Sequence, residues 1–92
     1  MLSESKKNII ELTLYGRVYC HLCHDMEKAL VALLHELGQG AEFSIELIDV
    51  DENEDLEHQF GERVPVLLAG GRELCHYFLD TEAVRAYLTE IR

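Results

Sequence analysis

The sequence predicts an α/β fold in which a four-stranded mixed sheet is flanked by helices. Apolar residues alternate in the first two predicted strands, they recur at helical spacing in three other segments, and a Gly70-Gly71 pair joins the last two strands. A strand–helix–strand start requires a parallel pair with a right-handed crossover, and the hairpin adds an antiparallel edge. The predicted order is β-α-β-α-β-β-α, in one domain of residues 9–92 behind a flexible N-terminal tail of residues 1–8.

The first strand and the long helix are predicted from apolar periodicity. Every second residue from Ile10 to Leu14 is apolar, and Gly16 ends the strand. The helix runs from about His21 to Leu37, and Gly38 and Gly40 stop it. Its apolar stripe consists of Met26, Leu30, Leu33, Leu34 and Leu37, widened by Ala29, Val31 and Ala32. We therefore expect the middle of this helix to be well buried.

The second strand is predicted near Phe43 to Val50. Its apolar residues fall on both faces, so we expect both faces to be covered. Residues 51–61 are acidic at their start and carry Leu56 and Phe60 four positions apart. That pattern predicts a short helix with negative charge at its N-terminus.

The third and fourth strands are predicted on either side of Gly70-Gly71. Val64 to Ala69 forms the third, with Pro65 at its start, and Arg72 to about Phe78 forms the fourth. Asp80 or Thr81 caps the last helix. The apolar face of that helix consists of Val84, Tyr87, Leu88 and Ile91.

The charge of the chain narrows the classes of partner. The formal net charge is −10, which repels phosphate backbones and anionic membranes, so we expect neither nucleic acid nor membrane as a partner. No apolar run approaches the length needed to span a bilayer. The acidic residues are spread along the chain. We therefore interpret the negative charge as serving solubility rather than the electrostatic steering of basic protein partners. We expect a monomer.

Three cysteines are present: Cys20, Cys23 and Cys75. An odd count without a secretory signal is not typical of a secreted disulfide scaffold, so we expect a cytoplasmic, reducing location. In that compartment a close cysteine pair is more often catalytic, redox-sensing or metal-binding than structural. Cys75 is interpreted as a small apolar residue of the fourth strand.

The spacing of Cys20 and Cys23 gives the two sulfurs different surroundings. Cys23 precedes Met26 by three positions and so lies on the buried stripe, whereas Cys20 lies near the N-cap, where the loop meets solvent. Unpaired N–H groups at a helix N-terminus stabilise an anion, so we expect a lowered pKa at Cys20. Cys20 would attack a substrate disulfide, and Cys23 would resolve the mixed disulfide.

Two basic residues near the pair have two interpretations each. His21, if protonated, would stabilise the Cys20 thiolate and make the pair more oxidising, or it is a solvated residue without redox influence. Arg17 would add positive potential, or it is a surface charge at the end of a strand.

The motifs as a set resemble the thioredoxin superfamily, and a glutaredoxin-like branch in particular. The stretch Leu12 to Cys23 is similar to the glutaredoxin strand–loop–cysteine segment, and Gly61 to Leu68 resembles the thioredoxin segment around an invariant cis-proline. The resemblance covers Ile10 to Ile91 and implies a thioredoxin-like βαβαββα fold. It also implies that Pro65 is cis and packs against the cysteine pair, and that the Val64 backbone hydrogen-bonds an extended thiol substrate.

The sequence departs from that family at two places. Glutaredoxins usually read Cys-Pro-Tyr-Cys, whereas this chain has His21 and Leu22 between the cysteines. Cys75 and His76 stand where glutaredoxins carry a glycine pair that helps to hold glutathione, which puts glutathione binding in doubt. Tyr19 stands where thioredoxin has a tryptophan.

The sequence therefore predicts a thiol–disulfide oxidoreductase, an enzyme in which Cys20 and Cys23 are catalytic. Val64 and Pro65 form the substrate platform, and Tyr19, Arg17 and His21 shape its rim. The expected substrates are disulfides of proteins or of low-molecular-weight thiols. No bound cofactor or metal is expected, because the cysteines carry the electrons, and glutathione or a partner reductase would supply them.

Two alternatives remain open at this stage. In the first, the three cysteines with His24 or His76 hold zinc, or Cys20 holds an iron–sulfur cluster, although structural zinc usually draws on two close pairs. In the second, the chain is a protein-interaction module that keeps the fold with little redox turnover.

Overall fold

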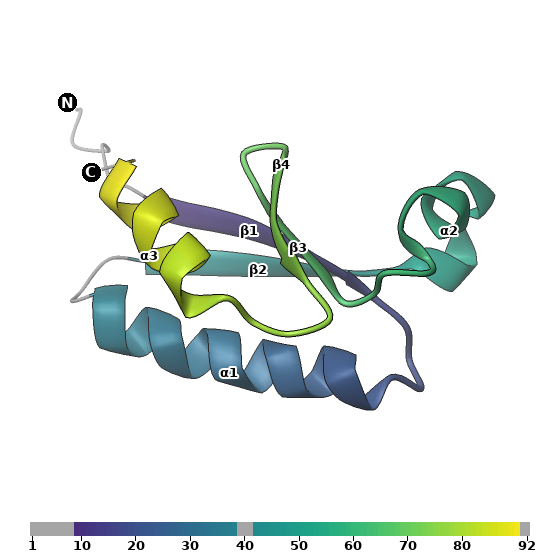
Figure 1. The fold of residues 1–92 in the computed structure, drawn as a ribbon, viewed down its shortest axis with the longest axis horizontal. Coiled ribbons are helices and arrows are strands. Elements are labelled where there is room, and N and C mark those ends of the chain that lie inside the picture. The colour runs from purple at the N-terminus through teal and green to yellow at the C-terminus, as the bar shows by residue number, and fades with distance from the viewer. Residues whose placement is uncertain (1–8, 39–41, 91–92) are drawn as a thin grey trace, which may run out of the picture.

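The computed structural model describes residues 9–38 and 42–90. The predicted tail, the stop signal at Gly40 and Ile91 of the last helical face lie outside the described residues. The described part contains four strands, three α-helices and one short 3₁₀ helix (Figure 1). Their bounds are β1 Ile9–Gly16, α1 His21–Gly38, β2 Glu42–Asp49, η2 Val50–Glu52, α2 Glu54–Phe60, β3 Val66–Ala69, β4 Arg72–His76 and α3 Thr81–Glu90.

The sheet has the strand order β2-β1-β3-β4, with β1 inside it. β1 pairs with β2 in parallel from Ile9–Glu42 to Gly16–Asp49, and it pairs with β3 antiparallel. β3 and β4 form the hairpin, whose two turn glycines, Gly70 and Gly71, both have positive φ. This arrangement confirms the predicted mixed sheet, including the parallel start and the antiparallel edge.

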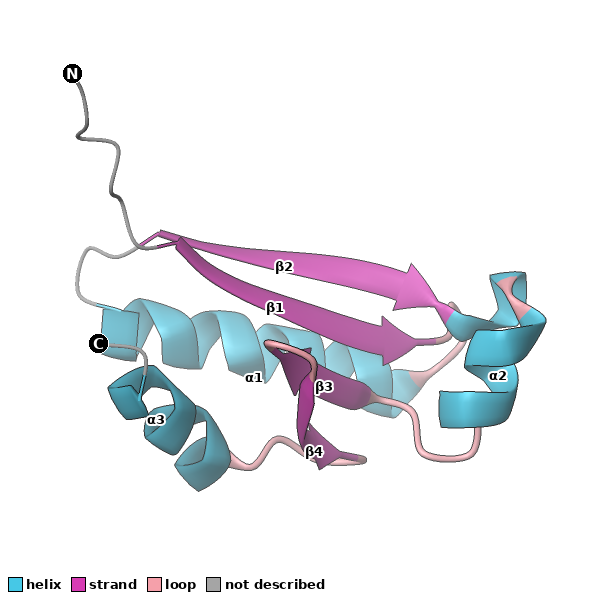
Figure 2. Cartoon of the chain, turned by 90° about the horizontal axis from the view of Figure 1, so that it is seen from above, coloured by secondary structure: helices cyan, strands magenta, loops and turns pink. Residues whose placement is uncertain are grey.

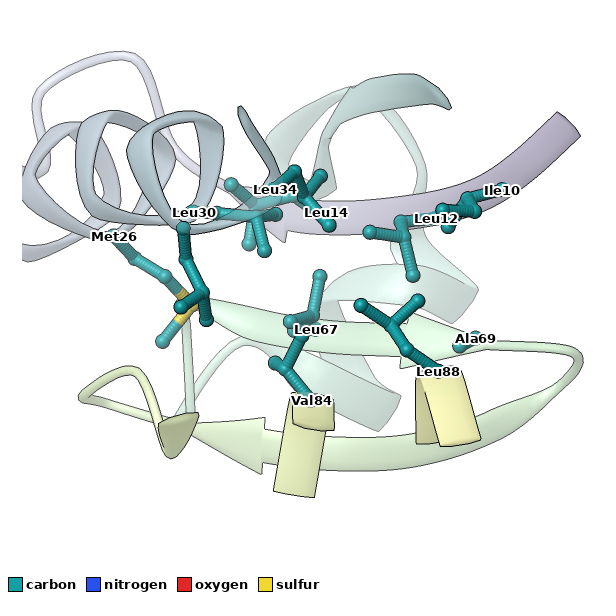
Figure 3. Packing of buried hydrophobic residues seen from close by; sticks show 11 residues of the cluster. Ile10, Leu12, Leu14, Met26, Leu30, Leu34, Leu67, Ala69, Val84 and Leu88 are labelled. Carbon is teal, nitrogen blue, oxygen red and sulfur yellow. The ribbon is translucent and has the colours of Figure 1, made fainter. Parts of the chain in front are cut away.

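Two apolar clusters cover the two faces of the sheet. The larger cluster joins α1 and α3 to β1 and β3, and Figure 3 shows the side chains of these elements pointing toward one another. It is centred on Leu30, Leu67 and Val84, which have almost no exposed surface. The smaller cluster, on the opposite face, consists of Val50, Phe60 and Val66, with Tyr15 stacked on Phe60 at 4.2 Å between ring centroids. Alternation along β1 produces this division, because Leu14 and Tyr15 point to opposite faces.

Figures 1 and 2 show where these layers place the ends of the strands. α1 runs along the length of β1 and β2, and α3 lies on the same side of the sheet. α2 lies beyond the end of β2, at the same end of the molecule as the start of α1. The carboxyl ends of β1 and β2 therefore converge with the first turn of α1 and with α2.

Local capping explains where the helices begin. The Asn53 side chain accepts a hydrogen bond from the N–H of Leu56 and starts α2. The Asp80 carboxylate accepts from the N–H of Ala83 at 3.1 Å, so Asp80, one of the two predicted residues, caps α3.

The structure corrects several details of the predicted elements. β3 begins at Val66 rather than Val64, and β4 ends at His76, because Tyr77 has a φ of 67° and leaves the extended conformation. The 51–61 helix is divided by Asn53 into η2 and α2. Val50, predicted in the second strand, belongs to η2.

The expected burial was wrong at two places. Ala29 and Ala32 are exposed, because α1 turns only its Met26–Leu30–Leu34 side to the sheet. Leu47 is 56% exposed, so β2 is not covered along its whole length on both faces. β2 is an edge strand, and the first turns of α1 leave its carboxyl end open.

Candidate active site

The cysteine pair lies where β1, one of the two inner strands, leads through a short loop into α1. The Cys20 carbonyl accepts a hydrogen bond from the N–H of His24, which makes Cys20 the N-cap residue of the helix. The N–H of Cys23 points to the sulfur of Cys20 at an N···Sγ distance of 3.0 Å. The sulfur thus takes the place of the serine or aspartate oxygen that usually caps a helix.

Cys20 and Cys23 form a disulfide, with a Cα–Cα distance of 5.2 Å. Cys23 is only 7% exposed and is buried at the start of α1, whereas Cys20 is half-buried. The predicted asymmetry, with an outer sulfur at the helix end and an inner one behind it, is therefore present.

Three residues next to the pair have different surroundings. Tyr19 is 98% exposed, and His21 is also exposed. His24 places its Nε2 3.1 Å from the carbonyl oxygen of Val18, which ties the loop back to the first turn of the helix.

Arg17 points toward α2. Its guanidinium pairs with Asp51 and Glu57 and donates to the carbonyl oxygen of Gly61. The hydrogen bond with Glu57, followed by the interactions with Asp51, raises the pKa of Arg17 despite the opposing effect of desolvation. These contacts match the interpretation of Arg17 as a surface charge at a strand end, and its place at the substrate rim stays a prediction.

The Val64–Pro65 peptide bond is cis, as the resemblance implied. Pro65 is fully buried, and its carbonyl oxygen accepts a hydrogen bond from the N–H of Tyr77 at 2.9 Å. The Tyr77 hydroxyl donates to the carbonyl oxygen of Glu62 at 3.0 Å. Among the described residues, Val64 has no backbone hydrogen bond, so its N–H and carbonyl group remain open to an extended partner.

An exposed apolar rim borders the pair, and sequence reasoning found only part of it. Leu22, Tyr77 and Phe78 line a common hollow beside the first turn of α1. Tyr77 is 42% exposed and Phe78 is 69% exposed. The signal that could have found these two aromatic residues is their place in the short connection between β4 and the Asp80 cap. The apolar rim consists of Val18, Tyr19, Leu22, Tyr77 and Phe78.

Cys75 is a free cysteine on β4, opposite Leu67 and packed against the larger cluster. Burial, together with the nearby charges of Asp80 and Glu73, raises the pKa of its thiol, although a backbone hydrogen bond at Asp80 opposes the rise. A raised pKa disfavours the thiolate, which is the reactive form. The residue matches its interpretation as a small apolar side chain.

Within residues 9–38 and 42–90, no three His, Cys, Asp or Glu side chains come together in a way that would hold a metal ion. None of the helices in these ranges combines the length and apolar character that crossing a membrane requires.

The fold and the site together define a class: a thioredoxin-like domain with a Cys-x-x-Cys pair at the start of its first helix. The family described as Glutaredoxin-like domain (DUF836) matches residues 11–89, and the chain belongs to that family. An uncharacterized protein of Mycobacterium tuberculosis is 35% identical over 81 residues, which cover 83% of this chain and 79% of the relative.

Solved structures agree with this assignment. A protein from Nitrosomonas europaea is 42% identical, with a TM-score of 0.73 and coverage of 85% of this chain and 89% of that one. A protein from X. campestris is 40% identical, with a TM-score of 0.58 and coverage of 86% and 96%. Thioredoxin 1 from Thermosipho africanus, at 19% identity and a TM-score of 0.56 over 89% and 98%, shares the fold.

Proposed function

We propose that this protein is a thiol–disulfide oxidoreductase that works through Cys20 and Cys23. The observation that carries the proposal is the N-cap geometry, in which the Cys23 N–H points to the Cys20 sulfur at 3.0 Å. After reduction, the same N–H and the free amide groups of the first turn would stabilise a thiolate at Cys20. The pair needs no bound cofactor, because the two sulfurs store the two electrons.

The order of the reaction steps follows from the outer position of the Cys20 sulfur and the inner position of the Cys23 sulfur. The Cys20 thiolate attacks a substrate disulfide, forms a mixed disulfide and releases one substrate thiolate. Cys23 then loses its proton and attacks the Cys20 sulfur. The bond between Cys20 and the substrate breaks, and the second substrate thiolate leaves. The substrate gains two electrons, and the pair ends as the disulfide seen in the structure. Glutathione or a partner reductase returns the electrons.

The apolar rim favours a protein disulfide as substrate. An extended segment would pair with the open Val64 backbone while its apolar side chains contact Tyr19 and Phe78. At the position of the glutaredoxin glycine pair, the His76 ring contacts Glu73 at 2.7 Å and the Tyr77 ring, which supports a protein over glutathione. We further propose that the protein works as a monomer in the cytoplasm, where a reducing environment would return the pair to its dithiol form.

The test follows mixed disulfides by mass spectrometry in glutathione redox buffers and with a model protein disulfide. The wild-type pair should oxidise and reduce reversibly. Cys23→Ser should accumulate a mixed disulfide at Cys20, because nothing resolves it. Cys20→Ser should form none and lose disulfide reductase activity.

Cys75→Ser is the matched control, and it should keep the wild-type behaviour because Cys75 packs against the core. A pair that never oxidises, or a Cys20→Ser variant with full activity, would contradict the proposal. That second outcome would favour the interaction module considered from the sequence.

A further inference from the structure

The connection between α2 and β3, residues 61–65, carries the open backbone of Val64, and we call it the platform loop. Its first half is held to α2, because the N–H of Arg63 donates to the carbonyl oxygen of Phe60 over 2.8 Å. The Arg63 guanidinium also pairs with Glu73 on β4. Val64 therefore follows a residue whose backbone and side chain are both fixed.

Tyr77, the first residue after β4, contacts the platform loop at two points, one before Val64 and one after it. Its hydroxyl donates to the carbonyl oxygen of Glu62 over 3.0 Å. Its N–H donates to the carbonyl oxygen of Pro65 over 2.9 Å. One residue outside the loop thus spans the segment that contains Val64, whose own N–H and carbonyl group have no partner among the described residues.

The backbone of Tyr77 adopts a conformation that is unusual for a bulky residue. Its φ is 67°, and among the described residues it is the only one other than glycine with a positive φ. Such a conformation persists only where the surroundings fix it, and it often marks a functional position. The ring is 42% exposed, so burial is a small part of that constraint. The two hydrogen bonds to the platform loop supply the rest.

A fixed platform loop matters for one class of substrate. An extended protein segment that pairs with Val64 gains main-chain hydrogen bonds, as a strand does when it is added to the edge of a sheet. A loop that is already ordered loses less conformational freedom when the segment binds, so binding is tighter. A small disulfide has no extended backbone and gains nothing from this order.

We propose that Tyr77 is a positioning residue, which holds the Val64 backbone in the conformation that pairs with an extended protein substrate. The inference rests on the proposed function and adds a source of selectivity to it. Tyr77 takes no part in the exchange of disulfides. It acts through the platform loop, and its contribution is to the binding of protein disulfides rather than to the reactivity of Cys20.

The test uses Tyr77→Phe, which removes the hydroxyl bond to Glu62 and keeps the aromatic ring. The KM for a protein disulfide should rise about fivefold, the effect of losing one ordinary hydrogen bond, with kcat unchanged. The rate with a small dialkyl disulfide should also stay unchanged. In the substrate-free protein, NMR order parameters of the Arg63 and Val64 amides should fall from the rigid value of about 0.85 toward about 0.6.

Tyr87→Phe is the matched control, because it removes a hydroxyl from α3 instead, and it should keep the wild-type KM and order parameters. Wild-type order parameters in Tyr77→Phe would overturn the inference even if KM rose, since the hydroxyl would then contact the substrate directly. An unchanged KM, or an equal loss of rate with the small disulfide, would overturn it as well. Failure of the wild-type protein to reduce either disulfide would instead overturn the proposed function, and the order parameters would still report whether Tyr77 holds the loop.

Discussion

Arg17, just after β1, donates a hydrogen bond from Nη2 to the carbonyl oxygen of Gly61, just after α2, over 3.1 Å. A side chain on Gly61 would occupy the space of this guanidinium, since its Cβ would lie 2.8 Å from Nη2. The contact joins the loop that carries Cys20 to the helix on the opposite face of the sheet. It makes α2 part of the support of the candidate site.

Arg17→Ala should lower the free energy of unfolding by about 1 kcal/mol, because partly exposed ion pairs contribute little and the bond to the Gly61 carbonyl adds to them. Urea unfolding at low and high salt measures the effect, which should shrink as salt screens the pairs. Arg85→Ala, an exposed change on α3, is the control. Equal stability of the two variants would show that Arg17 does not hold α2.

Gly16→Ala should destabilise the oxidised protein, because the new Cβ presses on a Cys23 sulfur that the disulfide holds in place. Overpacking costs about 1–3 kcal/mol, against about 0.4–1 kcal/mol gained from a less flexible unfolded chain. The net loss should be smaller after reduction, when the sulfur is free to shift. Urea unfolding of both redox forms measures it, and an equal loss in the two forms would rule out this cause.

Glu73 links stability to pH. Burial raises the pKa of its carboxyl, but hydrogen bonds and charges from Arg63 and His76 outweigh burial and hold the pKa below the ordinary 4.5. The carboxylate therefore stabilises the fold fully above the unfolded-state pKa, and this contribution is lost as the pH falls through the folded-state pKa.

Glu73→Gln should accordingly be less stable than wild type near neutral pH, and the difference should close in acid. Unfolding measured across the acidic range tests this expectation. Glu46→Gln, an exposed change on β2 at a residue without an ion pair in the described part of the chain, should show no such pH-dependent difference in stability. A stability difference between Glu73→Gln and wild type that stays constant with pH would contradict the lowered pKa of Glu73.

The apolar rim should affect the rate of reduction of protein disulfides and leave the rate with small disulfides unchanged. Phe78→Ser and Tyr19→Ser should each lower kcat/KM for a protein disulfide by roughly tenfold, since losing a buried aromatic contact costs about 1–2 kcal/mol. The rate with a small dialkyl disulfide should hardly change. Ile9→Ser, which alters an exposed apolar residue at the other end of β1, is the control. Equal losses on both substrates would show that the variants disturb the pair itself.

Strong local signals made much of the fold predictable. The apolar stripe of α1, the Gly70-Gly71 turn and the alternation along β1 each act within a few residues, and the structure confirms them. The positions of the two sulfurs also followed from helical periodicity, because Cys23 is in phase with Met26 and Leu30.

Features that depend on distant neighbours were not predictable. Leu47 is exposed on β2, an edge strand, and the residue pattern within a strand does not show whether that strand lies at an edge. The Arg17 contacts reach residues more than thirty positions away. The pocket lined by Gly16, Cys23 and Leu47 likewise forms only where two strands and a helix come together, so no short sequence motif predicts it.

The disulfide closes a ring of residues that are only three apart, inside the first turn of one helix. Such a short loop restrains the chain less than a bridge between distant segments, and it fastens no strand or second helix. The packing of α1 on the sheet is carried by Met26, Leu30 and Leu34, which lie outside this ring. If the pair exchanges electrons as proposed, we expect the packing of α1 on the sheet to be the same in both redox forms.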